Sequence, residues 1–175
     1  MILTNFNRVL QYISFTQPNA VASVRGSQKY PDLFGYVEFY QYQAGVYVLC
    51  IIGGLPVGQE ACNPGFFAIH LHDGGSCTPT EEEPFADAGG HYNPQECPHP
   101  AHAGDFPPLL ASGRGDAASL FFTDRFRVEE IMGKTVVIHR GPDDFTTQPG
   151  GNAGERIGCG VIAWRHGTSR FQAGF

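Results

Sequence analysis

Residues 66–72 read FFAIHLH, and this short apolar run with two histidines is the point from which the rest of the chain can be interpreted. Its aromatic and aliphatic composition predicts a β-strand. Because successive side chains of a strand point to opposite faces, His70 and His72 share one face. Two imidazoles on one stiff element can bind a single metal ion, although an isolated His-x-His is just as often a chance pair on a surface strand.

Similar strand patterns, broken by turn residues, occur on both sides of this segment. A series of short strands separated by about 8–12 residues is typical of an antiparallel sandwich or barrel, and we count about eight strands. The sequence therefore predicts an all-β fold. The other expected strands are 20–26, 34–42, 46–52, 118–123, 126–128, 134–139 and 156–164.

The N-terminus has a different period. Apolar residues at Leu3, Phe6, Leu10 and Ile13 recur in steps of three and four, which predicts a short helix with Thr4 or Asn5 as its cap. We expect three parts: an N-terminal extension over residues 1–19, one domain over 20–164, and a fraying tail over 165–175 that contains His166.

Composition excludes several classes of protein. The 175 residues include 23 Gly and 13 Pro but are only 16% charged, which argues against helical bundles and coiled coils. With 11 Lys and Arg and a net charge of -6, the chain offers no basic patch for nucleic acid. No apolar run is long enough to span a membrane. We recognise no signal peptide, and three cysteines in excess of one pair fit a reducing compartment, so we expect a cytoplasmic protein.

Two long loops, residues 73–117 and 140–155, interrupt the strand patterns, and such loops are usually functional or disordered. The first contains GGHYNPQECPHPAHAGD at residues 89–105. Its three histidines and one aspartate form a complete tetrahedral ligand set for zinc, unless polar residues have simply accumulated in a loop. A zinc site built on cysteines is a weak alternative because the sequence has no Cys-x-x-Cys. His139, at the end of a predicted strand, is a third candidate ligand beside His70 and His72.

Five segments together resemble the copper/zinc superoxide dismutase family, in the family's order, over residues 20–164. The resemblance implies a Greek-key β-sandwich or barrel, with copper and zinc as cofactors. The segments are HLHDGGSC (70–77), GGHYNP (89–94), HPAHAGD (99–105), GKTVVIHRGPDD (133–144) and GNAGERIGCGVI (151–162).

The resemblance also implies a role for individual residues. Copper would be bound by His70, His72, His91 and His139, and zinc by His91, His99, His102 and Asp105, so that His91 bridges the two metals. Asp143 would accept hydrogen bonds from His70 and His99, and Arg156 would lie at the copper channel. Cys77 and Cys159 would form a disulfide.

Each of the last assignments has a plainer alternative: Asp143 as a turn residue, Arg156 as a surface arginine, and the two cysteines as free thiols. Cys50 lies in an apolar run and is expected in the core, whereas Cys62 and Cys97 have no assigned role.

The function implied by the resemblance is dismutation of superoxide to dioxygen and hydrogen peroxide, with His91 and Arg156 as catalytic residues. The alternatives are a copper/zinc carrier or store without this activity, and a structural or adhesion sandwich. The sequence leaves the oligomeric state open. Only two residues separate His99 from His102, fewer than in many relatives, and the second loop has Thr146, Thr147 and Gln148 where relatives carry charged residues.

Overall fold

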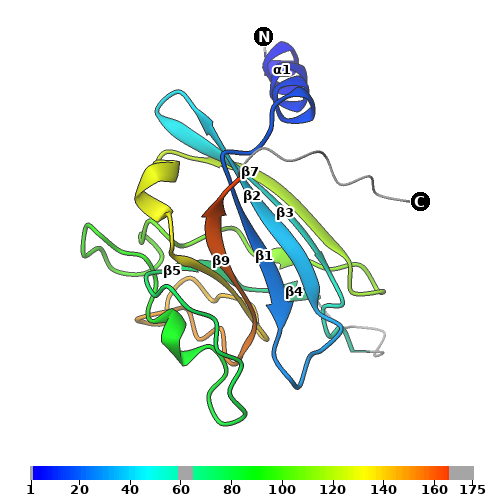
Figure 1. The fold of residues 1–175 in the computed structure, drawn as a ribbon, viewed down its shortest axis with the longest axis vertical. Helices are drawn as coiled ribbons and strands as arrows, with labels where there is room; N and C mark the ends of the chain where they lie inside the picture. Colours follow the sequence, from blue (N-terminus) through cyan, green and yellow to red (C-terminus); the bar gives the residue numbers. More distant parts are fainter. Residues whose placement is uncertain (1, 59–64, 166–175) are drawn as a thin grey trace.

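The computed structural model describes residues 2–58 and 65–165, which form one α-helix and nine β-strands (Figure 1). Cys62, His166 and the tail from 166 to 175 lie outside the described residues. The elements are α1 (Ile2–Phe15), β1 (Ala20–Gly26), β2 (Phe34–Tyr42), β3 (Gly45–Gly53), β4 (Phe66–Phe67), β5 (Ile69–His72), β6 (Leu109–Leu110), β7 (Ala117–Thr123), β8 (Thr135–His139) and β9 (Arg156–Trp164), with 3₁₀ helices η1 (Ala86–Ala88) and η2 (Val128–Ile131).

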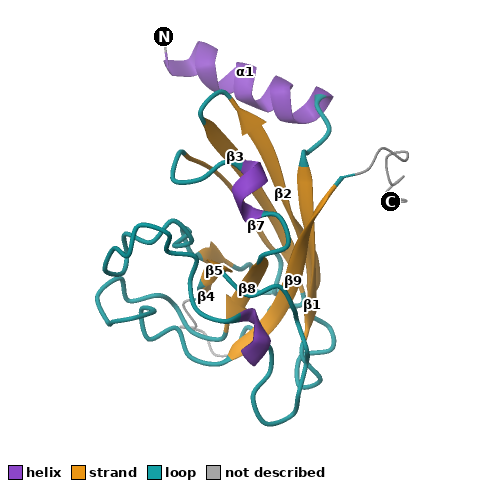
Figure 2. Ribbon diagram, turned by 60° about the vertical axis from the view of Figure 1, so that its left-hand side comes forward, coloured by secondary structure: helices purple, strands orange, loops and turns teal. Residues whose placement is uncertain are grey.

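Seven of the strands form one antiparallel sheet in the order β5-β8-β9-β1-β2-β3-β7. The sheet curls into a half-barrel, and a two-stranded ladder of β4 and β6 lies beside β7. Figure 2 shows the long loops gathered at one end of the sheet and α1 at the other. The predicted all-β class is confirmed, and the arrangement is consistent with a Greek-key sandwich.

The core follows from alternation along the strands. In β3 the side chains of Val46, Val48, Cys50 and Ile52 are buried, while the residues that follow each of them are partly exposed. Cys50 is therefore a core residue, as predicted. β8 differs because all five of its residues are buried, so the strand that carries His139 is covered on both faces.

Four local predictions were wrong. Residues 126–128 are not a strand, because Phe126, Val128 and Ile131 bury their side chains from the short helix η2 and the turn before it. The run 66–72 is two strands, since β4 pairs with β6 and β5 with β8. β6 lies inside the long first loop, where its two-residue ladder depends on β4. Helix α1 begins at Ile2, so Thr4 and Asn5 lie inside it and neither is the cap.

The predicted N-terminal helix is confirmed, and it packs through an aromatic contact. The ring of Tyr12 packs edge-on against those of Tyr40 and Tyr42, and its hydroxyl donates a hydrogen bond to the carbonyl of Gln41 at 2.8 Å. No helix within residues 2–58 and 65–165 is long and apolar enough to cross a membrane.

Candidate metal centre

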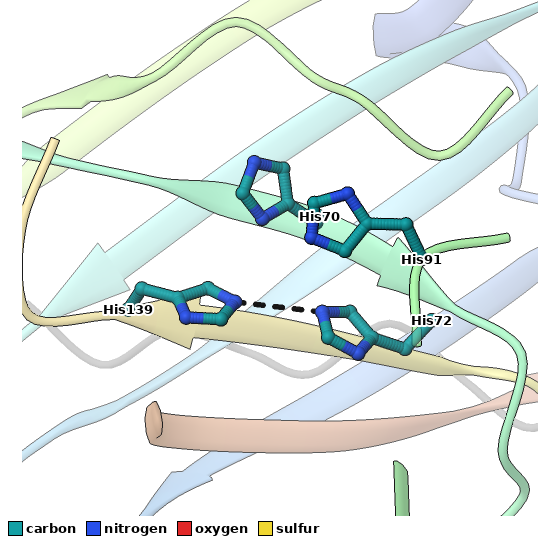
Figure 3. A group of neighbouring side chains, drawn as sticks. All are labelled: His70, His72, His91 and His139. Atoms are coloured by element: carbon teal, nitrogen blue, oxygen red, sulfur yellow. Dashed lines mark hydrogen bonds between the residues drawn. The ribbon is translucent and has the colours of Figure 1, made fainter. Parts of the chain in front are cut away.

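Two paired strands bring three histidines together. β5 and β8 are antiparallel, with His70 opposite Val137 and His72 opposite Thr135, and His139 ends β8. All three side chains are buried. The Nε2 atoms of His72 and His139 lie only 3.4 Å apart, and Figure 3 shows the two rings facing each other across neighbouring strands. The strand geometry thus gathers the predicted ligands into one group.

His91 comes from the first long loop and completes this group. An isolated β-bridge to His72 holds its backbone beside β5. Its ring centroid lies 4.0 Å from that of His70 and 4.9 Å from that of His72 (Figure 3). One potential ligand atom from each of His70, His72, His91 and His139 lies within 4.8 Å of the others. Four imidazoles at this spacing can bind one transition-metal ion.

A second group shares His91 with the first. His91 Nδ1 lies 2.7 Å from Asp105 Oδ1 and 3.3 Å from His102 Nδ1, and His99 Nδ1 lies 3.0 Å from Asp105 Oδ2. Because Nδ1 of His91 faces this second group, its other ring nitrogen is left for the first. The members are His91, His99, His102 and Asp105, with ligand atoms again within 4.8 Å of one another.

Asp143 connects the two groups through a hydrogen bond to one histidine of each. Its Oδ2 accepts a hydrogen bond from His70 Nε2 and its Oδ1 accepts one from His99 Nε2, both at 2.8 Å. The same carboxylate also accepts from the backbone N–H of Phe145, so it is a turn residue as well. Such partners fix the tautomer and the orientation of a metal-binding imidazole.

Two buried nitrogens without hydrogen-bond partners indicate that these residues fit metal ions. Nδ1 of His70 and Nδ1 of His99 are buried and have no hydrogen-bond partner among the described residues. His99 Nδ1 is close to Asp105 Oδ2 without the angle of a hydrogen bond, which is how two ligands converge on a shared ion. Buried polar atoms without partners are rare in folded proteins. An imidazole set and a His₃Asp set are suited to copper and zinc respectively.

Burial keeps these imidazoles neutral. It lowers the pKa of His70 to about 2 and that of His139 to about 4, with neighbouring histidines adding to the shift, and it lowers the pKa of His72 well below its usual value. Burial acts to raise the pKa of Asp105, but the hydrogen bond from His91 and the charges of the neighbouring histidines together outweigh it, so that this pKa is lowered. At neutral pH these three histidines are neutral and Asp105 is ionised, the forms that bind metal.

Arg156 lies at the edge of the first group. Its Nη2 donates to the carbonyl of Gly89 at 2.7 Å and its Nη1 to the carbonyl of Phe85 at 2.6 Å. The carbonyl of Gly89 also accepts from His72 Nδ1 at 2.9 Å, so the guanidinium and the imidazole share one acceptor. Arg156 is thus tied to the first loop beside His72.

The disulfide between Cys77 and Cys159 confirms the predicted pairing and attaches the first loop to β9, three residues from Arg156. Cys97 is a free, partly buried thiol.

Sequence reasoning missed the backbone acceptors. Gly89 and Gly154 orient His72 and His139 through their carbonyl oxygens, at 2.9 Å and 3.2 Å. It also missed the close approach of Gly150, where an added Cβ would lie 3.1 Å from Nε2 of His91. The only available signal was the glycine content of both loops.

A curled antiparallel sheet with two groups of potential metal ligands that share one histidine is typical of a β-barrel protein that can bind two neighbouring metal ions. A family model described as "Copper/zinc superoxide dismutase (SODC)" matches residues 34–162, and the chain belongs to this family. Copper and zinc are the cofactors of the family, and superoxide is its substrate.

Known proteins support this assignment. The chain is 32% identical over 145 residues to "Superoxide dismutase [Cu-Zn] 2" of Aquifex aeolicus, covering 75% of this chain and 80% of that protein. It is 37% identical over 116 residues to "Superoxide dismutase [Cu-Zn]" of Escherichia coli K12, covering 59% and 67%. The crystal structure of "the clock protein EA4" is similar with a TM-score of 0.67 at 28% identity, covering 86% of this chain and 98% of that chain.

Proposed function

We propose that the protein is a superoxide dismutase that converts superoxide to dioxygen and hydrogen peroxide at a copper/zinc centre bridged by His91. The observation that carries the proposal is the position of this imidazole between the two ligand groups, with Nδ1 turned to Asp105 and the ring beside His70 and His72. Copper would be held by His70, His72, His91 and His139, and zinc by His91, His99, His102 and Asp105.

When bound, copper would supply the one-electron redox chemistry, and zinc, which has none, would order the loop that carries its ligands. The chain's own residues then bind the substrate and handle protons. Arg156, beside His72, attracts the superoxide anion in a protein whose net charge is -6. His91 would take up a proton from water at the nitrogen facing the copper group in one half of the cycle and donate it to the reduced oxygen in the other, with the second proton of hydrogen peroxide coming from water.

Reconstitution with both metals tests the proposal. We expect one copper and one zinc per chain by elemental analysis and rapid removal of superoxide. The His139→Ala variant, which removes one buried imidazole from the copper group only, should retain zinc and lose the activity. Both metals bound without any dismutation would instead indicate a carrier or store, and absence of metal binding would indicate a purely structural sandwich.

A further inference from the structure

Gln148, in the second loop, makes an unusual pair of contacts with His99 of the first loop. Its side-chain Oε1 accepts a hydrogen bond from the backbone N–H of His99 at 2.9 Å, and its Nε2 donates one to the backbone carbonyl of the same residue at 2.7 Å. One planar amide therefore satisfies both backbone polar groups of a residue 49 positions away in the sequence. The pair joins the two long loops.

The backbone of His99 depends on these two hydrogen bonds. Among the described residues, no backbone–backbone hydrogen bond involves its N–H or its carbonyl. The residue is only 4% exposed, so water is a poor substitute for these partners. By contrast, isolated β-bridges hold the backbones of His91 and Asp105 against His72 and His70.

The ring of His99 needs a fixed backbone because both of its nitrogens have assigned directions. Nε2 donates to Asp143 Oδ1 at 2.8 Å, and Nδ1 lies 3.0 Å from Asp105 Oδ2 without forming a hydrogen bond to it. A backbone that could move would leave only the contact with Asp143 to orient the ring. Partners of this kind, one step removed from the metal, commonly change metal affinity by about 10–100-fold.

We propose that Gln148 is a positioning residue for the zinc half of the centre: its amide holds the backbone of His99 so that Nδ1 converges with the other zinc ligands. The inference rests on the proposed function, because it assigns zinc to His99. The copper-side residues His72 and His139 are oriented by other acceptors, the carbonyls of Gly89 and Gly154. The effect of losing Gln148 is therefore greatest on zinc.

The test uses the full chain in three variants. Gln148→Ala removes both hydrogen bonds, and Gln148→Met removes them while keeping the length of the side chain. Gln95→Ala is the matched control, since Gln95 lies in the first loop close to His99 in sequence but its side chain is exposed. Zinc affinity is measured by competition with a chromophoric chelator, copper affinity by a separate Cu²⁺ titration, and stability by thermal unfolding of the metal-free protein.

We expect zinc affinity to fall by about ten-fold in both Gln148 variants, with copper affinity within about two-fold of wild type and no change in the control. The visible spectrum of Co²⁺ bound in place of zinc should shift in the same two variants, because its ligand geometry changes. If Gln148→Ala unfolds, the Gln148→Met variant decides the outcome.

Unchanged zinc affinity in a folded Gln148 variant would overturn the inference, and so would an equal loss of zinc and copper affinity together with lower stability. If the wild-type protein itself binds no zinc, the proposed function fails instead, and the two failures are thus distinguished.

Discussion

The two halves of the metal centre are built in different ways. Three members of the copper group, His70, His72 and His139, come from the paired strands β5 and β8, and the ladder of those strands fixes their spacing. The zinc group comes from a loop whose shape depends on side chains from elsewhere: Gln148 holds His99, and Arg125 donates from Nη1 to the carbonyl of His102 at 2.9 Å. Backbone pairing thus positions the strand-borne copper ligands, whereas side-chain hydrogen bonds position His99 and His102 of the zinc group.

This difference indicates which substitutions should affect one metal-binding group more than the other. A change at Gln148 reaches the zinc group directly, whereas three of the copper ligands are carried by the paired strands β5 and β8. His91 and Asp143 contact both halves and should affect both when altered. Arg156 is linked to His72 through the carbonyl of Gly89, which accepts a hydrogen bond from each of them.

The largest effect is expected from reversing the charge at Arg156. Arg156→Glu should lower the rate of superoxide removal by about 100-fold, because the anion then meets a negative charge beside the copper group. Both metals should remain bound, as measured by elemental analysis of the purified protein. Arg156→Lys retains the positive charge and should lose much less activity. An unchanged rate in the Glu variant would remove Arg156 from the mechanism.

Asp143→Ala should weaken metal binding in both halves of the centre. Its carboxylate accepts from His70 and from His99, so we expect affinity for copper and zinc to fall together by about 10–100-fold. Separate titrations with each metal measure this. Asp124→Ala, at an exposed carboxylate outside the site, is the control and should bind both metals normally. A loss restricted to one metal would show that the two halves are not joined through Asp143.

Substitution of two glycines in the second loop should lower stability by different amounts, because only one of them lies against Asp143. Gly151 and Gly154 both have positive φ. An added Cβ at Gly151 would lie 2.0 Å from Asp143 Oδ1, whereas an added Cβ at Gly154 would have no neighbouring atom within 4 Å. We expect Gly154→Ala to lower the free energy of unfolding by about 1 kcal/mol and Gly151→Ala by about 2–3 kcal/mol. Urea unfolding of the metal-free proteins measures both. Equal losses would mean that the loop moves away from Asp143 at little cost.

The most gradual effect concerns pH. In the unfolded chain a histidine protonates near its usual pKa of about 6.5, but burial lowers the pKa of His139 to about 4 and of His70 to about 2 in the folded protein. Between these values the unfolded state binds more protons, so stability falls as pH falls. The urea midpoint of the metal-free protein should therefore decrease from pH 7 to pH 4. His139→Gln should show a shallower decrease; an identical slope would contradict the role of burial at this position.

The sequence alone predicted those parts of the fold that have a strong local pattern. The strands 20–26, 34–42 and 156–164 were predicted with the bounds that the structure has, because proline, asparagine or glycine lies within three residues of the start of each. The two-residue strands β4 and β6 could not be predicted as a pair, since each exists only through the other. The run 126–128 was too short for its period to distinguish a strand from η2.

The candidate site divides in the same way. Histidine is rare enough in the chain that spacing alone singled out His70, His72 and His139 and the loop set of His91, His99, His102 and Asp105. The family pattern added the bridging role of His91, together with Asp143, Arg156 and the disulfide. The tertiary structure decided how they are oriented: the carbonyls of Gly89 and Gly154, the amide of Gln148 and the close approach of Gly151. Every residue has a carbonyl, and which one meets an imidazole depends on how distant segments pack, so no local pattern of the sequence specifies it.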